Sequence, residues 1–263
     1  MQNLLLHSDS IYRKQPCCHS DGRDCNCYNC LEEGFYGPDP DTYSCLKKLC
    51  YYTMNFGPAY TSEIYNYLGY SKLLETNFSN CVVNVISLGC GFGSDRIALN
   101  NYINDKNLNI TIDYAGIDIE KQWRTILQQA EPQFYIRNII ENPVSLNEYN
   151  IVFINKLFST LKNQGLDENF LDIFVNSMLD TLPDDGFIIF NDVNHRDLGR
   201  DQFDNKIRPL MKNVSKFFYN INGAYTGNYE AIPNSSNIFR IPSGLSVTPK
   251  PDVTKAVFFQ YKK

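Results

Sequence analysis

The sequence predicts an α/β fold in which a doubly wound sheet of about seven strands is covered by helices on both faces. Almost wholly apolar strand runs, such as residues 149–155, alternate with helical stretches from residue 82 onward, as a parallel sheet buried on both faces requires. A glycine-rich turn at 89–93 joins the first strand to the first helix. Seven of the nine cysteines lie in the first fifth of the chain, which sets a small N-terminal module apart.

Three regions follow from these patterns. Residues 1–45 are expected to form a cysteine-rich, zinc-binding module. Within it, residues 16–45 carry cysteines among turn-forming Gly, Pro, Asp and Asn with no sustained apolar period, so this stretch needs cross-linking to be ordered. Residues 46–75 form a helical lid or linker, whose helical pattern is expected to break at Gly57-Pro58 because proline cannot continue a helix. Residues 76–263 form the α/β domain.

Within the α/β domain, apolar runs bounded by turn residues predict the strands, and amphipathic stretches between them predict the helices. The expected strands cover 82–88, 110–118, 133–139, 149–155, 186–192, 216–222 and 255–263. The expected helices cover 94–103, 121–130, 166–182 and 201–213. A loop rich in Gly, Pro, Asn and Ser separates the last two strands.

Composition narrows the function classes. The formal net charge is −5 and no stretch gathers five Lys or Arg, so nucleic acid is not the favoured partner. The N-terminus offers only three consecutive leucines in place of a secretory signal, and no window approaches the apolar length of a membrane span. We therefore expect a cytoplasmic protein that acts on small molecules or proteins. The oligomeric state is not indicated.

The glycine turn and the acidic residue after the second strand have the pattern of a nucleotide-type cofactor site. Glycines at 89, 91 and 93 permit a sharp turn and a close approach of ligand to backbone. Asp118 ends the second strand, where a carboxylate can accept two hydrogen bonds from the hydroxyls of a ribose. A solvated loop aspartate or a helix cap is the alternative reading of Asp118.

The segments SLGCGFGSD and YAGIDIE, in this order across residues 82–263, resemble class I S-adenosylmethionine (SAM)-dependent methyltransferases. The resemblance implies that the glycines flank the methionine part of SAM, that Asp118 holds the ribose, and that Ile119 packs on the adenine. It places Asn138 near the adenine amine and Asn155 at the methyl-transfer site. The cofactor-binding residues implied are Gly89, Cys90, Gly91, Gly93, Asp118, Ile119, Asn138 and Asn155.

The same resemblance implies a closing antiparallel strand pair, which 216–222 and 255–263 would supply. One position departs from the family pattern: Ser87 stands where an acidic residue is common, so a contact to the SAM amine must come from elsewhere. A nicotinamide-binding Rossmann fold is the runner-up, although its third glycine usually sits one residue later.

The acceptor is not identified by the sequence. Asn155-Lys156-Leu157-Phe158 lacks the Pro-Pro-aromatic turn of amino-methylating nucleic-acid enzymes. Asp192 and His195, after the fifth strand, are the catalytic candidates for accepting a proton, and a solvated turn is an equal reading. The leading hypothesis is a SAM-dependent methyltransferase. The alternatives are an RNA methyltransferase with a zinc module and a non-catalytic binding protein of the same fold.

The cysteine cluster predicts a structural metal site. Soft ligands are dense in residues 17–30, and the Cys27-x-x-Cys30 spacing is that of a zinc knuckle. A tetrahedral Zn²⁺ would supply folding energy that this core-poor segment lacks. The candidate ligands are Cys18, His19, Cys25, Cys27 and Cys30. An iron–sulfur cluster and unligated thiols are the alternatives.

Overall fold

The computed structural model describes residues 1–16, 25–36, 44–127, 133–221 and 227–263 of the chain. Its centre is one eight-stranded sheet with the order β3-β2-β1-β4-β5-β8-β6-β7. The strands are β1 (Cys81–Leu88), β2 (Ile110–Asp118), β3 (Phe134–Ile136), β4 (Ile151–Asn155), β5 (Phe187–Val193), β6 (Asn213–Tyr219), β7 (Glu230–Ile232) and β8 (Ala256–Lys262).

The first five strands run parallel, and β8 inserts antiparallel between β5 and β6. The closing antiparallel pair that the resemblance implied is therefore confirmed. The prediction of seven strands is wrong by one, since β7 adds a parallel partner to β6. Its three residues, Glu-Ala-Ile, lie in the loop rich in turn formers. Their strand conformation depends on pairing with β6, so the composition of the loop does not predict it.

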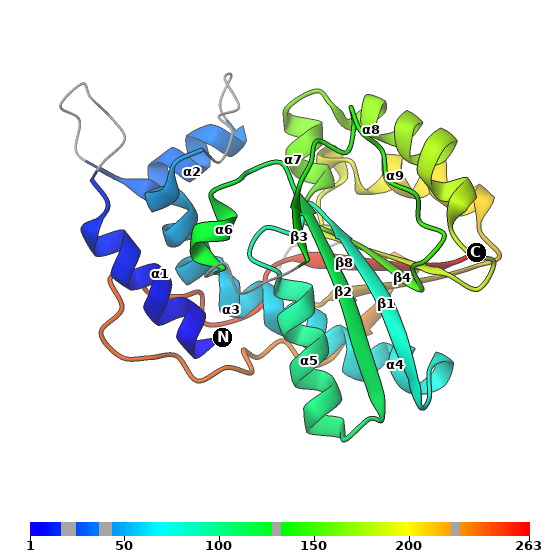
Figure 1. Cartoon of the computed structure of the whole chain (residues 1–263), viewed down its shortest axis with the longest axis horizontal. Coiled ribbons are helices and arrows are strands. Elements are labelled where there is room, and N and C mark those ends of the chain that lie inside the picture. Colours follow the sequence, from blue (N-terminus) through cyan, green and yellow to red (C-terminus); the bar gives the residue numbers. More distant parts are fainter. Residues whose placement is uncertain (17–24, 37–43, 128–132, 222–226) are drawn as a thin grey trace.

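Helices cover both faces of the sheet (Figure 1). One face carries α7 (Phe158–Asn163), α8 (Asp167–Ile173) and α9 (Arg200–Ile207); the other carries α4 (Leu73–Asn77), α5 (Ser94–Lys106) and the C-terminal half of α3 (Leu46–Ser71). Along β1, Val83 and Val85 pack with the second group, whereas Ile86 and Leu88 pack with the first. This alternation of buried residues is what a sheet buried on both faces requires.

The helix α3 is continuous across Gly57-Pro58, so the expected break there is wrong. Both residues are buried, together with most of the α3 positions around them. Tertiary packing of this kind outweighs the local cost of proline, because most helical stability in proteins comes from buried contacts. The Phe92 ring lies in ordinary van der Waals contact with this part of α3, 3.7 Å from the position of a Gly57 Cβ.

Other expected helices differ from the prediction in length or in helix type. The helix expected over 121–130 is reduced to α6 (Trp123–Ile126), with 128–132 outside the described residues. The helix expected over 166–182 continues from α8 as a π turn at Phe174–Met178 and a 3₁₀ turn at Leu179–Thr181. The helix expected over 201–213 ends in the 3₁₀ turn Arg208–Leu210.

Two further helices precede α3: α1 (Gln2–Lys14) and α2 (Cys27–Tyr36). On the left of Figure 1, α1 lies against α3 and beside the orange loop that leads to β8. Leu5 is fully buried there with Met54 and Val247. No helix among the described residues is long and apolar enough to cross a membrane.

Candidate functional site

The glycine turn between β1 and α5 has the geometry that the sequence predicts. Gly89, Gly91 and Gly93 have φ of +67°, +53° and +74°, a region that side chains disfavour. The Cys90 N–H donates to the Ile117 carbonyl at 3.0 Å, which ties the turn to the end of β2. A Cβ on Gly89 would stand 2.8 Å from Leu157 Cδ1, so the turn also lies directly against the segment that follows β4.

Asp118 ends β2 beside this turn. Its Oδ2 accepts a hydrogen bond from the Gly91 N–H at 2.9 Å, and its Oδ1 accepts one from the Glu120 N–H at 2.9 Å. Burial raises the pKa of Asp118 to about 6, against the lowering effect of these two N–H donors. The carboxylate is thus fixed in place, and each oxygen keeps a further lone pair for a ligand hydroxyl.

Two further residues of the predicted site, Ile119 and Asn138, lie near Asp118. Ile119 is 62% exposed, so a large apolar side chain stands open beside the carboxylate. The Arg137 N–H donates to the Asp118 carbonyl at 2.9 Å, which brings Asn138 close to the tip of β2. The Asn138 Oδ1 accepts from the Ile140 N–H at 3.1 Å and so caps a turn, while its side chain remains partly exposed.

A buried acid beneath the glycine turn was missed by the sequence reading. Asp95, in the first turn of α5, is fully buried, and burial raises its pKa. Its Oδ1 accepts from the Tyr114 hydroxyl at 2.9 Å, and the fully buried Ser87 hydroxyl lies beside it. A carboxyl group is therefore present next to Ser87 after all, supplied by the helix and not by the strand. The acidic residue two positions after the last glycine was the available signal.

Asn155, the last residue of β4, is buried at 9% exposure. Neither its Oδ1 nor its Nδ2 has a hydrogen-bond partner among the described residues. Leaving a buried amide unsatisfied costs about 1–3 kcal/mol per group, so native structures usually satisfy such groups with a partner, water or ligand. Asn155 thus carries polar groups that the described part of the chain does not use.

An aromatic layer from α3 covers the glycine turn. The Tyr52 ring centroid lies 6.3 Å from that of Phe92 and 6.1 Å from that of Trp123. Trp123, in α6, also lies 3.5 Å from where a Gly91 Cβ would be. These contacts place the region predicted as a lid over the predicted cofactor turn.

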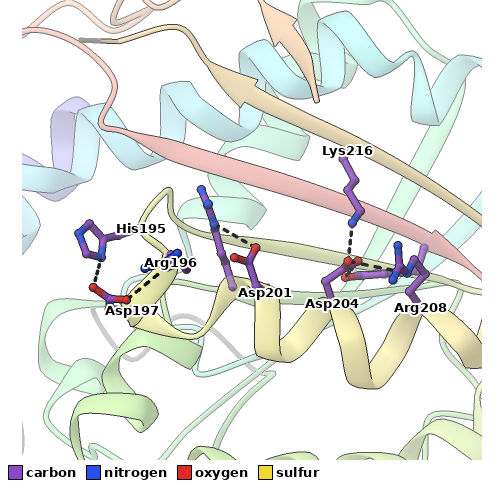
Figure 2. A network of polar contacts seen from close by, with 9 residues as sticks. His195, Arg196, Asp197, Asp201, Asp204, Arg208 and Lys216 are labelled. Atoms are coloured by element: carbon purple, nitrogen blue, oxygen red, sulfur yellow. Dashed lines mark hydrogen bonds and ion pairs between the residues drawn. The ribbon is translucent and has the colours of Figure 1, made fainter. Parts of the chain in front are cut away.

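The two catalytic candidates do not face each other. Asp192 is buried, and its Oδ2 and Oδ1 accept from the Ser159 and Val193 N–H groups at 2.9 and 2.7 Å. Burial raises its pKa. Figure 2 shows His195 directed to Asp197, 4.0 Å away on the exposed turn before α9. Asp192 therefore acts as an acceptor for the backbone at the start of α7, and His195 lies on the surface.

The cysteine cluster is only partly described. Cys18 and His19 lie outside the described residues. Cys27 and Cys30 lie one turn apart on α2, with Cys25 just before it. Burial, followed by the neighbouring thiols of Cys25, Cys45 and Cys30, raises the pKa of Cys27 to about 12. Within the described ranges, however, no group of three or more His, Cys, Asp or Glu side chains is arranged to hold a metal ion.

Two cavities flank the site. A cavity of about 470 Å³ lies behind the glycine turn, lined by residues such as Met1, Arg96 and Gln133. It includes neither Asp118 nor Asn155, and Leu127 and Gln133 border a segment outside the described residues. A smaller cavity of about 260 Å³ opens between α2, α3 and the ends of β4 and β5. We regard the smaller one as the relevant cavity because it adjoins the residue after Asn155.

No protein-family model and no curated protein sequence matches this chain. Solved structures with similar folds include several SAM-dependent methyltransferases. The plantazolicin methyltransferase BpumL, solved with SAH, is 13% identical over 99% of both chains, with a TM-score of 0.47. A TehB-like SAM-dependent methyltransferase from Corynebacterium glutamicum is 11% identical over 98% of both chains, with a TM-score of 0.44. A SAM-dependent methyltransferase from Thermotoga maritima is 12% identical over 79% of this chain and 92% of its own, with a TM-score of 0.43.

Proposed function

We propose that this chain is a SAM-dependent methyltransferase. The observation that carries the proposal is the hydrogen bond from the Gly91 N–H to the Asp118 carboxylate, which joins the glycine turn and the acid at the tip of β2 into one rigid cradle. The positive φ values of the turn and the exposed Ile119 beside it support a ligand with a ribose and a flat base.

The residues present fit the cofactor. Asp118 would accept hydrogen bonds from the two ribose hydroxyls, and Ile119 would cover one face of the adenine. Asn138 would meet the edge of that base. The unsatisfied amide of Asn155 fits a polar group of the cofactor or acceptor at the end of β4. Bound SAM supplies an electrophilic methyl group on a sulfonium, while the chain's own part is to align the acceptor and exclude water.

The acid–base demand of the reaction is small, which agrees with the positions of the two candidates. Asp192 is engaged by two backbone N–H groups, and His195 is exposed beside Asp197. We propose that neither is needed as a strong base when the acceptor is already a good nucleophile. Small molecules and proteins remain the favoured acceptors over nucleic acid, on the negative net charge of the chain.

Calorimetry with SAM and SAH tests the cofactor assignment. The wild type is expected to bind both at micromolar concentrations, and Asp118→Ala to bind them at least about tenfold more weakly, because two charge-assisted hydrogen bonds are lost. Asp172→Ala, on the far side of α8, is the matched control and should bind like the wild type. Absence of binding to the wild type would refute the assignment.

Labelled SAM incubated with fractionated metabolites, proteins and RNA then identifies the acceptor class. Label in the metabolite or protein fraction is the expected result. Label found only in RNA would show that the acceptor is RNA and not a small molecule or protein, while the cofactor assignment would stand. Tight SAM binding without transfer to any fraction would favour the non-catalytic alternative.

Structural zinc is a separate proposal that rests on the cysteine spacing. The described thiols of Cys25, Cys27 and Cys30 do not by themselves form a metal site, so Cys18 or His19 would have to complete it. Elemental analysis of protein purified without added metal decides this. About one zinc per chain supports the proposal, whereas a value near zero with titratable thiols contradicts it. No step of methyl transfer depends on the outcome.

A further inference from the structure

The smaller cavity has aromatic walls. Tyr28 and Phe35 of α2 face it from one side, and Tyr52, Phe56 and Tyr60 of α3 face it from the other. The Asn163 side-chain amide donates to the Phe35 carbonyl at 2.8 Å, which holds α2 in place against α7. The helix that bears the cysteines is therefore also a wall of this cavity, next to the predicted methyl-transfer position.

A buried cation lines the same cavity. Lys156 directly follows Asn155 and has a φ of +53°, a conformation that non-glycine residues adopt at a cost. Its side chain is 9% exposed, and its Nζ lies 2.8 Å from Oε2 of Glu63, which is fully buried on α3. The Lys156 Nζ also lies 3.5 Å from the Thr254 hydroxyl.

This arrangement leaves one donor of Lys156 for a ligand. An ammonium group has three N–H donors, and among the described residues its polar partners are Glu63 and Thr254. Glu63 is itself committed elsewhere, since its Oε1 accepts from the Thr254 N–H and hydroxyl at 2.8 and 2.6 Å. The remaining N–H has no oxygen partner among the described residues and lies near the Tyr60 ring, 4.9 Å from Nζ to the ring centroid. Because Lys156 lines the cavity, a stronger acceptor bound there can take this N–H in place of the ring.

The aromatic faces are already engaged by cations. The Phe56 and Tyr60 rings stack at 5.3 Å with an interplanar angle of 17°. Lys156 Nζ lies 4.9 Å from the Tyr60 centroid, and Lys250 Nζ lies 5.1 Å from the Phe56 centroid. A positively charged acceptor would have to displace these ammonium groups, so the walls are unsuited to a cation although aromatic faces attract cations in general.

The charge of the lining is positive. Lys156, Lys250 and Lys255 line the cavity, and Glu32 is the acidic residue among the described lining residues. Glu63 behind Lys156 leaves one excess positive charge when all five groups are counted. An anion entering the cavity therefore meets a favourable field, in a partly desolvated setting where such attraction is stronger than in bulk water.

We propose that this cavity binds the methyl acceptor and that the acceptor is a small aromatic molecule carrying a carboxylate or a phosphate. The inference rests on the proposed function for its methyl donor. The acid group bonds to Lys156, with Lys250 and Lys255 at the entrance, and the ring packs among the aromatic side chains of α2 and α3. The acceptor-binding residues are thus Lys156 and Lys250, and neither is a catalytic base in this proposal.

Ligand-observed NMR with simple probes tests this, with and without saturating SAH. Benzoate and phenyl phosphate represent the two acid groups, benzamide is the neutral match, and benzylamine is the cation. The wild type is expected to bind benzoate or phenyl phosphate about tenfold more tightly than benzamide, the ratio that one charge-assisted hydrogen bond provides. Benzylamine should bind most weakly.

Three variants assign the preference to the cavity. Removing Lys156 alone would leave the buried Glu63 carboxylate without its ion-pair partner, so the pair is replaced together as Lys156→Met with Glu63→Gln. This double variant should lower the ratio to about two to three, the share that Lys250 still provides. Lys250→Gln, at an exposed position, should lower it about two- to threefold. Lys106→Gln, on α5 and away from the cavity, should leave it unchanged.

The outcomes separate the two proposals. Equal binding of benzamide or benzylamine, no binding of either acid at millimolar concentration, or an unchanged ratio in the double variant would overturn the acceptor inference. Failure of the wild type to bind SAH, measured by calorimetry on the same samples, would instead overturn the cofactor assignment, whatever the probes show. A preference for phenyl phosphate over benzoate, or the reverse, identifies the acid group.

Discussion

The Asp118 side chain has two roles: it holds the local backbone in place, and it is the proposed ligand of the ribose. As a carboxylate it accepts the Gly91 and Glu120 N–H groups and so holds the glycine turn against β2. Burial raises its pKa to about 6, which means that the group changes charge within an accessible pH range. The charged form is the one that accepts hydrogen bonds from ribose hydroxyls with both oxygens.

We therefore expect the affinity for SAH to fall as the pH is lowered through 6. Between about pH 7.5 and pH 5, protonation of the free protein should weaken binding by about tenfold, as a single group with a pKa of about 6 dictates. Asp118→Asn should bind weakly at about pH 7.5 and show little pH dependence, whereas Asp172→Asn should follow the wild type. Calorimetry across this range is the measurement, and a flat wild-type profile would contradict the role of Asp118.

Gly89 and Gly91 differ in what surrounds them, although φ is positive at both. A Cβ at Gly89 would meet Leu157 Cδ1 at 2.8 Å, whereas at Gly91 the nearest atom is Trp123 Cζ2 at an ordinary 3.5 Å. Gly91→Ala should cost about 1 kcal/mol of unfolding free energy from φ alone. Gly89→Ala should cost about 1–3 kcal/mol more, from overpacking against Leu157.

Chemical denaturation of the two variants checks this order. Leu157→Ala in the Gly89→Ala background should show a favourable coupling energy, because it removes the atoms that collide. Equal losses for both glycine variants, or additive effects of Gly89→Ala and Leu157→Ala, would mean that Leu157 moves aside freely.

At the level of elements, α3 and α6 meet over the glycine turn. The buried rings of Phe92 from the turn and Trp123 from α6 form one aromatic group with the partly buried Tyr52 from α3. Trp123 is the single tryptophan of the chain. Its environment therefore reports on this junction without any label.

We expect the emission of Trp123 to change when SAH is added, with a midpoint equal to the calorimetric dissociation constant. The physical reason is the contact of the indole ring with the turn at Gly91. Tyr52→Leu should alter the emission of the free protein and reduce the change on binding, while Tyr135→Leu, on the exposed side of β3, should alter neither. If the Trp123 emission does not change at saturating SAH, the ligand does not reach this side of the turn.

The sequence predicts those elements whose signals are local. The strand expected over 110–118 has the bounds of β2, because its apolar residues and its closing acid lie within one short segment. The glycine turn and Asp118 could be predicted for the same reason. The continuity of α3 and the strand β7 could not, since both depend on distant packing partners. Glu63 and Lys156 come into contact only in the folded chain, and the sequence around either residue does not predict the ion pair.

Considered as a whole, the molecule ties its N-terminal helix to its C-terminal loop. The Asp9 carboxylate accepts from the Ser246 N–H at 2.7 Å, and Arg13 donates to the Gly244 carbonyl at 2.5 Å. The His7 ring nitrogen lies 2.9 Å from the Thr125 carbonyl of α6. Helix α1 thus contacts α3, α6 and the loop before β8, so the predicted module at 1–45 is joined to the α/β domain by direct contacts of its first helix.

Five aspartates with shifted pKa values form two sets with opposite consequences for stability. Burial raises the pKa of Asp95, Asp118 and Asp192. The pKa values of Asp9 and Asp167 are lowered. Burial alone would raise them, but hydrogen bonds from Ser246 to Asp9 and from Lys162 to Asp167 outweigh the effect of burial. A lowered group loses its stabilising effect only as the pH falls below the ordinary value of 3.8.

The aspartates with raised pKa values determine how stability changes with pH above the ordinary aspartate pKa. A folded state that binds a proton more tightly than the unfolded chain gains stability as the pH falls through the folded pKa, and the gain is complete below the unfolded pKa. We therefore expect the unfolding midpoint of the free protein to rise as the pH falls from about 7.5 to about 5. Asp118→Asn should make this rise shallower by removing one titrating group. Saturating SAH should oppose it, because the ligand favours ionised Asp118. Denaturation midpoints at three pH values, with and without SAH, measure both trends, and a midpoint that falls steadily toward pH 5 in the free protein would show that the buried carboxyls are ionised throughout.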